Sequence, residues 1–433
     1  MTSLSRWGAA SALRHRNFRL LWIAFLVSFT GSNMQSAAIL WHVSLLVSPD
    51  RKGLALGAVG LVRVVPIVIF SMIGGVMADA WHRQRLMLMT QTLLAIVALV
   101  LAAMTARGVV NLGALYGLTA LGAMIGSFDL PARQALVPNL VPRDDLPNAL
   151  SLNTAMMQAA SITGPAAGGI LIGTLGLTWV YALNALSFLF VIAALLMMRG
   201  LPEDIPGVDR EAMSWQSAVE GLRFVFSSPL LRSTTLLDFF ATFFSSAVAL
   251  LPIFAQDILQ VGPQGYGWLY AAPAAGAVIM SIAMIALTDR IRSRGPVLLW
   301  AVVIYGAATV GFGLSRSFWI TFACLALTGV ADTVSMVIRS IVSQLETPDR
   351  LRGRMTGVRM VFFMGGPQLG ELEAGAVAQW LGAPFSVISG GLGCMVATAW
   401  VAATTPELRH YRAETQRQSA TTGTTITTST TKL

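Results

Sequence analysis

Five ionisable side chains stand inside long apolar stretches of this 433-residue chain: Arg63, Asp238, Asp332, Glu371 and Glu373. A carboxylic acid in apolar surroundings can bind and release a proton as its solvation changes, and an arginine can hold a carboxylate or an anionic ligand. Ionisable groups at membrane depth are costly, and they usually serve a proton or substrate pathway. These residues are therefore the first candidates for the chemistry of the chain.

The composition indicates that the surrounding medium is a lipid bilayer. Hydrophobic residues make up 55% of the chain and charged residues only 11%, whereas soluble domains carry about 25% charged residues. This excludes a disordered protein, a disulfide scaffold and an ordinary cytosolic enzyme. Cys324 and Cys394 lie within apolar runs and are predicted to be small buried residues, with no disulfide and no metal site.

A membrane helix needs about 20 predominantly apolar residues. The sequence contains twelve stretches of about this length, which are the candidate membrane helices. They lie at roughly 18–46, 54–78, 86–106, 111–135, 149–175, 177–198, 231–256, 266–288, 296–315, 318–339, 356–381 and 384–404. The predicted fold is an all-α integral membrane protein with twelve transmembrane helices.

The predicted domains follow from these helices. A short N-terminal segment (1–17) precedes a six-helix bundle (18–198). A linker (199–230), with an amphipathic helix at 215–226, leads to a second six-helix bundle (231–404) and a disordered tail (405–433).

Basic residues are concentrated on one side of the predicted membrane. With the N-terminus inside, most of the 29 Lys and Arg residues fall on the inner side, in the N-terminal segment, the linker, the tail, the inner loops and the inner ends of predicted helices, Arg133 and Arg339 among them. The outer loops hold Arg51, Lys52, Arg107 and Arg316. This bias predicts a multi-pass protein of the plasma (inner) membrane with both termini in the cytoplasm.

The two halves of the chain repeat each other. Asp79, at the inner end of the second predicted helix, recurs as Asp289 at the inner end of the eighth, and Asp129 recurs as Asp332. Six helices precede the linker and six follow it, so the halves have the same orientation. Parallel repeats of this kind are typical of transporters whose site lies between the halves.

The loop after the second predicted helix has a recognisable pattern. Gly75, Asp79, Arg83 and Arg85 match Gly-x-x-x-Asp-x-x-x-Arg, which resembles the signature loop of the major facilitator superfamily. The resemblance implies that Asp79 latches this loop to the eleventh helix when the protein is open outward. It also implies that Arg83 meets an acid on the fourth helix, for which Asp129 is well placed. The alternative is a basic loop that only sets the topology.

Gly164, Pro165, Gly168 and Gly169 in the fifth predicted helix resemble the exporter motif of the same superfamily, which occurs mostly in antiporters. Proline removes a helix hydrogen bond, and glycines let a neighbouring helix pack closely. The alternative is a kinked packing site without directional meaning.

A narrower resemblance rests on 140–149, 344–354 and 407–412. These segments look like the enterobactin exporter branch, which also holds macrolide and other drug efflux proteins. The resemblance implies proton-driven export from the cytoplasm.

In the superfamily, the first, fourth, seventh and tenth helices line the central cavity. The resemblance therefore places Asp129, Asp238 and Asp332 on cavity-forming helices, where Asn33 and Gln35 of the first helix can add neutral hydrogen-bonding groups. Asp238 and Asp332 are the leading candidates for the carboxylate that carries the coupling proton. The alternative is a structural hydrogen bond near the inner surface.

The second and eleventh helices face each other across the halves in this superfamily. We therefore hypothesise that Arg63 pairs with Glu371 or Glu373 when the outer side is closed. Positions two apart are separated by about 200° around a helix, so only one of the glutamates can face Arg63.

The predicted function is secondary active transport by alternating access, in the form of proton-coupled export of a small amphiphilic molecule such as a siderophore or drug. The alternatives are an importer on the same scaffold and a non-transporting membrane sensor or scaffold. No nucleophile–base pair, metal cluster or phosphate-binding loop indicates an enzyme or a cofactor, so the proton gradient is the expected energy source. The expected partners are a small-molecule substrate and membrane lipids, without nucleic acid, and the expected state is a monomer.

Overall fold

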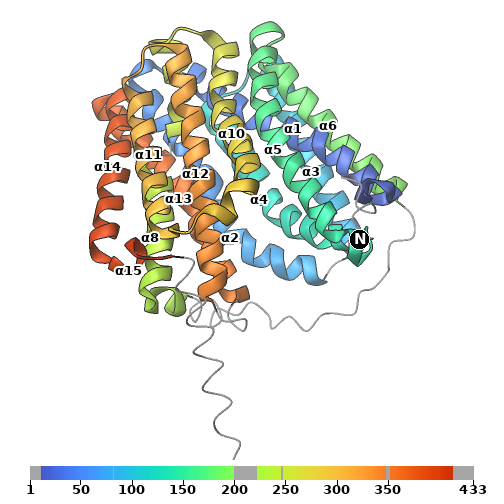
Figure 1. The fold of residues 1–433 in the computed structure, drawn as a ribbon. Coiled ribbons are helices and arrows are strands. Elements are labelled where there is room, and N and C mark those ends of the chain that lie inside the picture. Colours follow the sequence, from blue (N-terminus) through green and yellow to red (C-terminus); the bar gives the residue numbers. More distant parts are fainter. Residues whose placement is uncertain (1–10, 81, 199–221, 245–246, 348–351, 413–433) are drawn as a thin grey trace, which may run out of the picture.

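The computed structural model describes residues 11–80, 82–198, 222–244, 247–347 and 352–412, and the regular elements in these ranges are all helical (Figure 1). Eleven stretches of the described chain are long and apolar enough to cross a membrane. A further long helix, α13, occupies the remaining predicted span, the eleventh at 356–381. The predicted amphipathic helix at 215–226 lies largely outside the described residues, as does the predicted tail beyond 412.

The first half consists of six long helices, preceded by a short 3₁₀ turn at Ser11–Arg14. They are α1 (Arg16–Leu46), α2 (Lys52–Ala80), α3 (Arg83–Ala106), α4 (Leu112–Leu136), α5 (Leu146–Thr174) and α6 (Leu177–Met197). The second half contains α8 (Pro229–Phe244), α10 (Gly262–Leu287), α11 (Arg294–Leu314), α12 (Phe318–Glu346), α13 (Arg352–Leu381), α14 (Ala383–Thr404) and the short α15 (Pro406–Arg409).

The seventh predicted span is not one regular helix. After α8 the chain forms a 3₁₀ turn (η5, Ala247–Leu250), a short α9 (Leu251–Ile253) and a π-helical turn (η6, Phe254–Ile258) before α10. Pro252 lies in the first turn of α9. Proline fits a helix start because it has no N–H to donate, and it is unfavourable in a helix interior. The predicted span at 231–256 is confirmed as the apolar stretch Pro229–Ile258, but it consists of several short elements and not of one regular helix.

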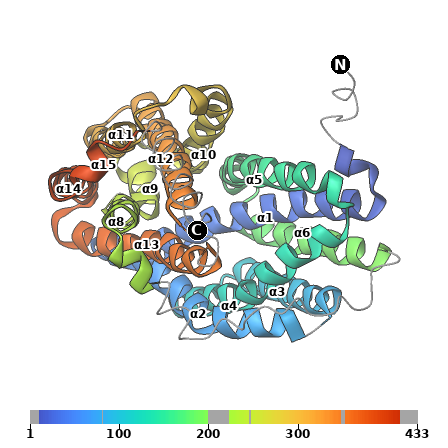
Figure 2. The same ribbon diagram turned by 60° about the horizontal axis from the view of Figure 1, so that its bottom comes forward.

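The same packing pairs recur in both halves. In the first, α1 packs on α5, α2 on α4, and α3 on α6. In the second, α8 packs on α13, α10 on α12, and α11 on α14. These are the first–fifth, second–fourth and third–sixth pairs of each bundle, as the internal repeat predicts. Figure 2 shows the two bundles side by side.

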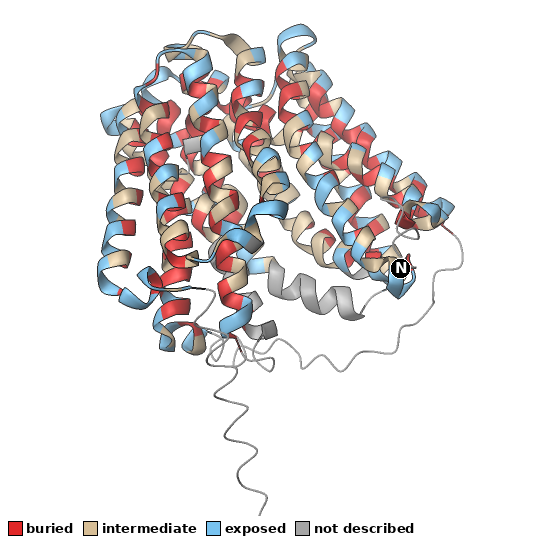
Figure 3. Cartoon of the chain, in the orientation of Figure 1, coloured by how far each residue is buried: buried red, intermediate tan, exposed pale blue. Residues whose placement is uncertain are grey.

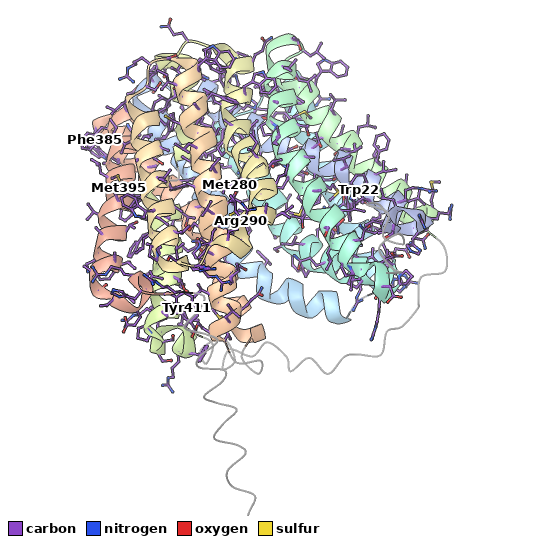
Figure 4. The ribbon with its side chains drawn as sticks, in the orientation of Figure 1. Trp22, Met280, Arg290, Phe385, Met395 and Tyr411 are labelled. Carbon is purple, nitrogen blue, oxygen red and sulfur yellow. The ribbon has the colours of Figure 1, made fainter. Side chains whose placement is uncertain are left out.

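We name the two ends of the molecule by their charge. The basic end holds the start of α1 and the junctions at Arg83, Arg290 and Arg409, and the opposite end holds the junctions that follow Leu46 and Leu314. At the basic end, His15 Nε2 lies 2.7 Å from Asp145 Oδ2. The N–H of Gly295 donates to the carbonyl oxygen of Tyr411 (labelled in Figure 4) at 3.1 Å, which joins the start of α11 to the segment that follows α15.

Large apolar side chains cover the outside of both bundles. Trp319, Trp380 and Ile285 are at least three-quarters exposed, and buried and exposed positions alternate along the helices (Figure 3). Such a surface is stable only against lipid. Of the two cysteines, Cys394 is buried as predicted, and Cys324 is only partly covered.

Candidate functional site

The two halves meet closely where α2 packs on α13. Gly53, Gly57 and Gly60 of α2 face α13. A Cβ placed on Gly57 would lie 2.7 Å from the carbonyl oxygen of Glu371 and 2.9 Å from the Cα of Gly375. The two backbones are therefore in contact, and a residue with a side chain could not occupy this position without separating the helices.

A second close contact joins α5 to α10. A Cβ on Gly169 would lie 2.5 Å from the carbonyl oxygen of Pro263 and 2.7 Å from the Cα of Gly267. The other glycines of the predicted exporter motif face α1, because a Cβ on Gly164 would lie 2.7 Å from the carbonyl oxygen of Thr30. The motif therefore serves two contacts, one within the first half and one across the halves.

The positions of the two contacts show which end of the molecule is closed. The long helices that meet extensively across the halves are α2 with α13 and α5 with α10, and both contacts involve the segments near the opposite end. The main packing partners of α4 and α6, and of α12 and α14, lie within their own halves. The described residues thus form an arrangement in which the two halves are closed at the opposite end.

A polar latch holds that closed end. Lys52 Nζ donates to Gln256 Oε1 at 3.0 Å and to the two Asp257 carboxylate oxygens at 3.2 and 3.1 Å. The side-chain amide of Gln256 donates to Ser44 Oγ at 2.7 Å. Lys52 begins α2 and is 8% exposed, whereas Gln256 and Asp257 lie in the π-helical turn of the second half. From the sequence, Lys52 was predicted only to be an outer-loop residue. No sequence pattern predicted the π-helical turn.

Reversing the charge of Lys52 tests the latch. We expect Lys52→Glu to weaken closure at the opposite end about tenfold, because it places a second carboxylate at a buried position beside the half-exposed Asp257. Lys52→Glu combined with Asp257→Lys should recover most of the closed population. Disulfide trapping between cysteines introduced at Leu54 and Leu381, in a background without Cys324 and Cys394, measures that population. Equal trapping in all variants would show that the latch does not contribute.

A buried ion-pair cluster occupies the second half. The Arg339 guanidinium on α12 pairs through Nη1 with Asp238 Oδ1 on α8, and its Nη2 lies 3.8 Å from Asp332 Oδ1. Arg339 is 4% exposed, while the Asp332 side chain is 49% exposed. Asp332 also borders a hollow of about 470 Å³, which Tyr305, Thr309 and Thr328 help to line. The structure therefore brings together the two predicted proton-carrying aspartates around one arginine.

The position of Arg339 refines the sequence prediction, which ended the tenth predicted helix at this residue and counted it with the basic residues of the inner side. Helix α12 continues to Glu346, and Arg339 is buried inside it. Burial of an arginine at this depth is possible because two carboxylates surround the guanidinium. Hydropathy alone ends the span at the first basic residue, so it missed both the length of α12 and the cluster.

Asp129 is held in a similar way in the first half. Its Oδ2 accepts from Arg133 Nη2 at 2.7 Å, and its Oδ1 accepts from Thr90 Oγ1 and Gln91 Nε2, each at 2.8 Å. Asp129 is 5% exposed. Arg133, which the sequence placed near the inner end of the fourth predicted helix, lies within α4 and stacks over the Phe25 ring at 4.1 Å from its centroid.

The predicted signature loop is only partly described. Helix α2 continues through Gly75 and Asp79 to Ala80, but the side chain of Asp79 lies outside the described residues. Arg83 begins α3, and Arg85 follows in its first turn on the exposed side. Pairing of Arg83 with Asp129, and the latch from Asp79 to the eleventh helix, stay predictions.

The pair predicted between α2 and α13 is positioned but not formed. Glu371 faces α2, since a Cβ on Gly60 would lie 3.0 Å from both its Cβ and its Oε2. Glu373 is half-buried, two positions further along the helix. Arg63 interacts electrostatically with Glu371 and with the Tyr270 hydroxyl of α10. None of the ion pairs formed by the described residues joins Arg63 to either glutamate.

The neutral candidates on α1 make contacts within the first half. Asn33 Nδ2 donates to the carbonyl oxygen of Phe29 at 2.8 Å. Gln35 Oε1 accepts from Asn184 Nδ2 of α6 at 2.7 Å. In this arrangement both side chains are engaged in helix packing.

Comparisons with known proteins agree with this architecture. The profile of the family described as transmembrane secretion effector matches residues 7–428. The enterobactin exporter EntS of Escherichia coli K12 is 28% identical over 403 residues, which cover 92% of this chain and 94% of that protein. EntS of the enteropathogenic strain E2348/69 has the same identity and coverage.

Solved structures share the fold. A bacterial homologue of the human lysosomal transporter Spinster, in an inward-facing, unoccupied conformation, gives a TM-score of 0.71 at 14% identity, covering 94% of this chain and 100% of that one. A bacterial homologue of the iron transporter ferroportin, also inward-facing, gives 0.68 at 13% identity, with coverages of 92% and 99%. The chain belongs to the transmembrane secretion effector family of the major facilitator superfamily.

Proposed function

We propose that this protein is an exporter of the inner membrane that moves a small amphiphilic molecule, of the siderophore or drug class, out of the cytoplasm in exchange for protons. The observation that carries the proposal is the closure of the two bundles at the opposite end, where the described residues form glycine contacts between α2 and α13 and between α5 and α10. Two bodies that meet in this way can rock about a site between them, which is the basis of alternating access.

Its direction and substrate class are supported by the relatives. The description of the family names secretion, and the matched E. coli protein is an enterobactin exporter. The basic end, which gathers most of the arginines, is the cytoplasmic end in this proposal. The chain then works as a monomeric transporter without catalytic chemistry or a bound cofactor.

Coupling is proposed to use the ion-pair cluster. Asp332 is the more exposed carboxylate of the cluster and lies further from Arg339 than Asp238 does. A proton on Asp332 would leave Arg339 paired with Asp238 alone. A substrate that competes for the same cavity-facing carboxylate is therefore exchanged against a proton.

Transport in oriented vesicles tests the proposal, with enterobactin as the probe. An E. coli strain without its own enterobactin exporter supplies inverted and right-side-out vesicles. We expect accumulation in the inverted vesicles when their lumen is acidic, and loss of this gradient dependence with Asp332→Asn. Accumulation only in right-side-out vesicles would identify an importer. A phenotype that persists without transport of any tested siderophore or drug would favour a sensor or scaffold.

A further inference from the structure

Two buried acceptor oxygens without hydrogen-bond partners lie on the face of α13 that packs against α2. They are Oε1 of Gln368 and Oε2 of Glu371. These residues are three positions apart and therefore neighbours on one helix face. Two acceptors side by side at a closed helix contact are unfavourable, because a buried oxygen without a donor costs the free energy of a lost hydrogen bond.

Among the residues that the structure describes, no cation forms an ion pair with Glu371. Its side chain packs in the notch left by Gly60, where a Cβ would lie 3.0 Å from Oε2. Arg63 is one turn further along α2 and acts on Glu371 electrostatically without forming one of the ion pairs of the described residues. An ionised carboxylate in this notch would be desolvated and unpaired.

The other elements around Glu371 offer no closer charge. On α10, Tyr266 and Tyr270 are its ionisable neighbours. On the far side of α13, Phe243 of α8 contacts Gly370, and the α8 carboxylate Asp238 is paired with Arg339. Neither η5 nor α14 contains a charged residue.

We propose that Glu371 is a proton-binding site that controls closure at the opposite end: it is protonated while α2 and α13 are in contact, and it ionises when they part. A proton on Oε2 turns one of the two acceptors into a donor, so Glu371 can bond to Gln368 Oε1. When the contact opens, water reaches the Glu371 side chain and stabilises the carboxylate. The inference rests on the alternating access of the proposed function, but it concerns a different carboxyl from Asp332 and requires no particular substrate.

A distance measurement without substrate tests this proposal. Spin labels at Leu54 of α2 and Leu381 of α13, both exposed positions near the opposite end, report the separation of the two helices by pulsed electron resonance between pH 5 and 9. In the otherwise wild-type protein we expect the short distance at low pH and a growing long-distance population as the pH rises. Glu371→Gln, which mimics the neutral acid, should keep the short distance over the whole range.

Two further variants test whether Glu371 itself binds the proton that controls closure. Glu373→Gln, on the same helix but two positions away, should titrate like the parent protein. Gln368→Leu removes the acceptor for the proposed proton and should weaken proton binding up to about tenfold, which moves the transition to lower pH. A Glu371→Gln variant that opens with pH as the parent does would overturn the proposal. Vesicle transport of enterobactin measured on the same variants separates this outcome from failure of the exporter function.

Discussion

Arg339→Leu is expected to lower the free energy of unfolding by roughly 3–5 kcal/mol, the usual effect of removing one partner from a buried ion pair. The substitution leaves the Asp238 carboxylate, which is 8% exposed, without its cation. It also removes the only positive charge within ion-pair distance of Asp332 among the described residues. We expect transport of the enterobactin probe to fall at least a hundredfold. The melting temperature of the detergent-purified protein and uptake into inverted vesicles measure the two effects.

A double variant distinguishes loss of charge balance from loss of packing. Arg339→Leu with Asp238→Asn leaves no unpaired charge at α8, and it should regain much of the lost melting temperature while transport stays low. Arg339→Lys keeps the charge but cannot span both carboxylates with one planar group, so an intermediate loss is expected. A single Arg339→Leu variant with an unchanged melting temperature would show that the cluster is not a structural ion pair.

Gly169→Ala is expected to prevent full closure at the opposite end and to reduce transport more than tenfold. The added Cβ would meet the carbonyl oxygen of Pro263 at 2.5 Å and the Cα of Gly267 at 2.7 Å. These are backbone atoms of α10, so no side-chain rotation relieves the clash and the helices must separate. Overpacking of this kind costs about 1–3 kcal/mol, and each 1.4 kcal/mol corresponds to a tenfold change in the open-to-closed ratio.

Gly122→Ala provides the matched control. A Cβ on Gly122 of α4 meets no atom within 4 Å, so this variant carries the same change in helix propensity without a clash. Disulfide trapping between positions 54 and 381 should fall in Gly169→Ala and stay at the parent level in Gly122→Ala. If both variants trap and transport like the parent, the α5–α10 contact does not limit closure.

The sequence allowed the fold to be predicted because the bilayer constrains it strongly. Apolar length defines the spans, and the internal repeat requires two matching bundles; the recurring pairs of helices confirm this. The seventh span was the exception, since hydropathy cannot distinguish a regular helix from a run of short 3₁₀, α and π turns of the same composition. The π-helical turn that presents Asp257 depends on local hydrogen bonding and leaves no mark on the hydrophobic pattern.

The site was predictable only in part. Rarity of charge within the spans drew attention to Asp238, Asp332 and Glu371, whose roles stay predictions. The same rule failed for Arg133 and Arg339, because a basic residue near the predicted end of a span resembles a loop residue until its acidic partner on another helix is known. Which glutamate faces α2 also required the structure, as the helix period shows only that one of the two must face elsewhere.

The π-helical turn at Phe254–Ile258 determines the direction in which the carboxylate of the latch points. Its hydrogen bond from the N–H of Leu259 to the carbonyl oxygen of Phe254, at 2.7 Å, encloses one residue more than an α-helical turn does. One additional residue rotates the following side chains by about 100° around the helix axis. A single inserted codon therefore suffices to bring a carboxylate round to Lys52. Relatives that close without this carboxylate should show a one-residue gap at this turn in an alignment.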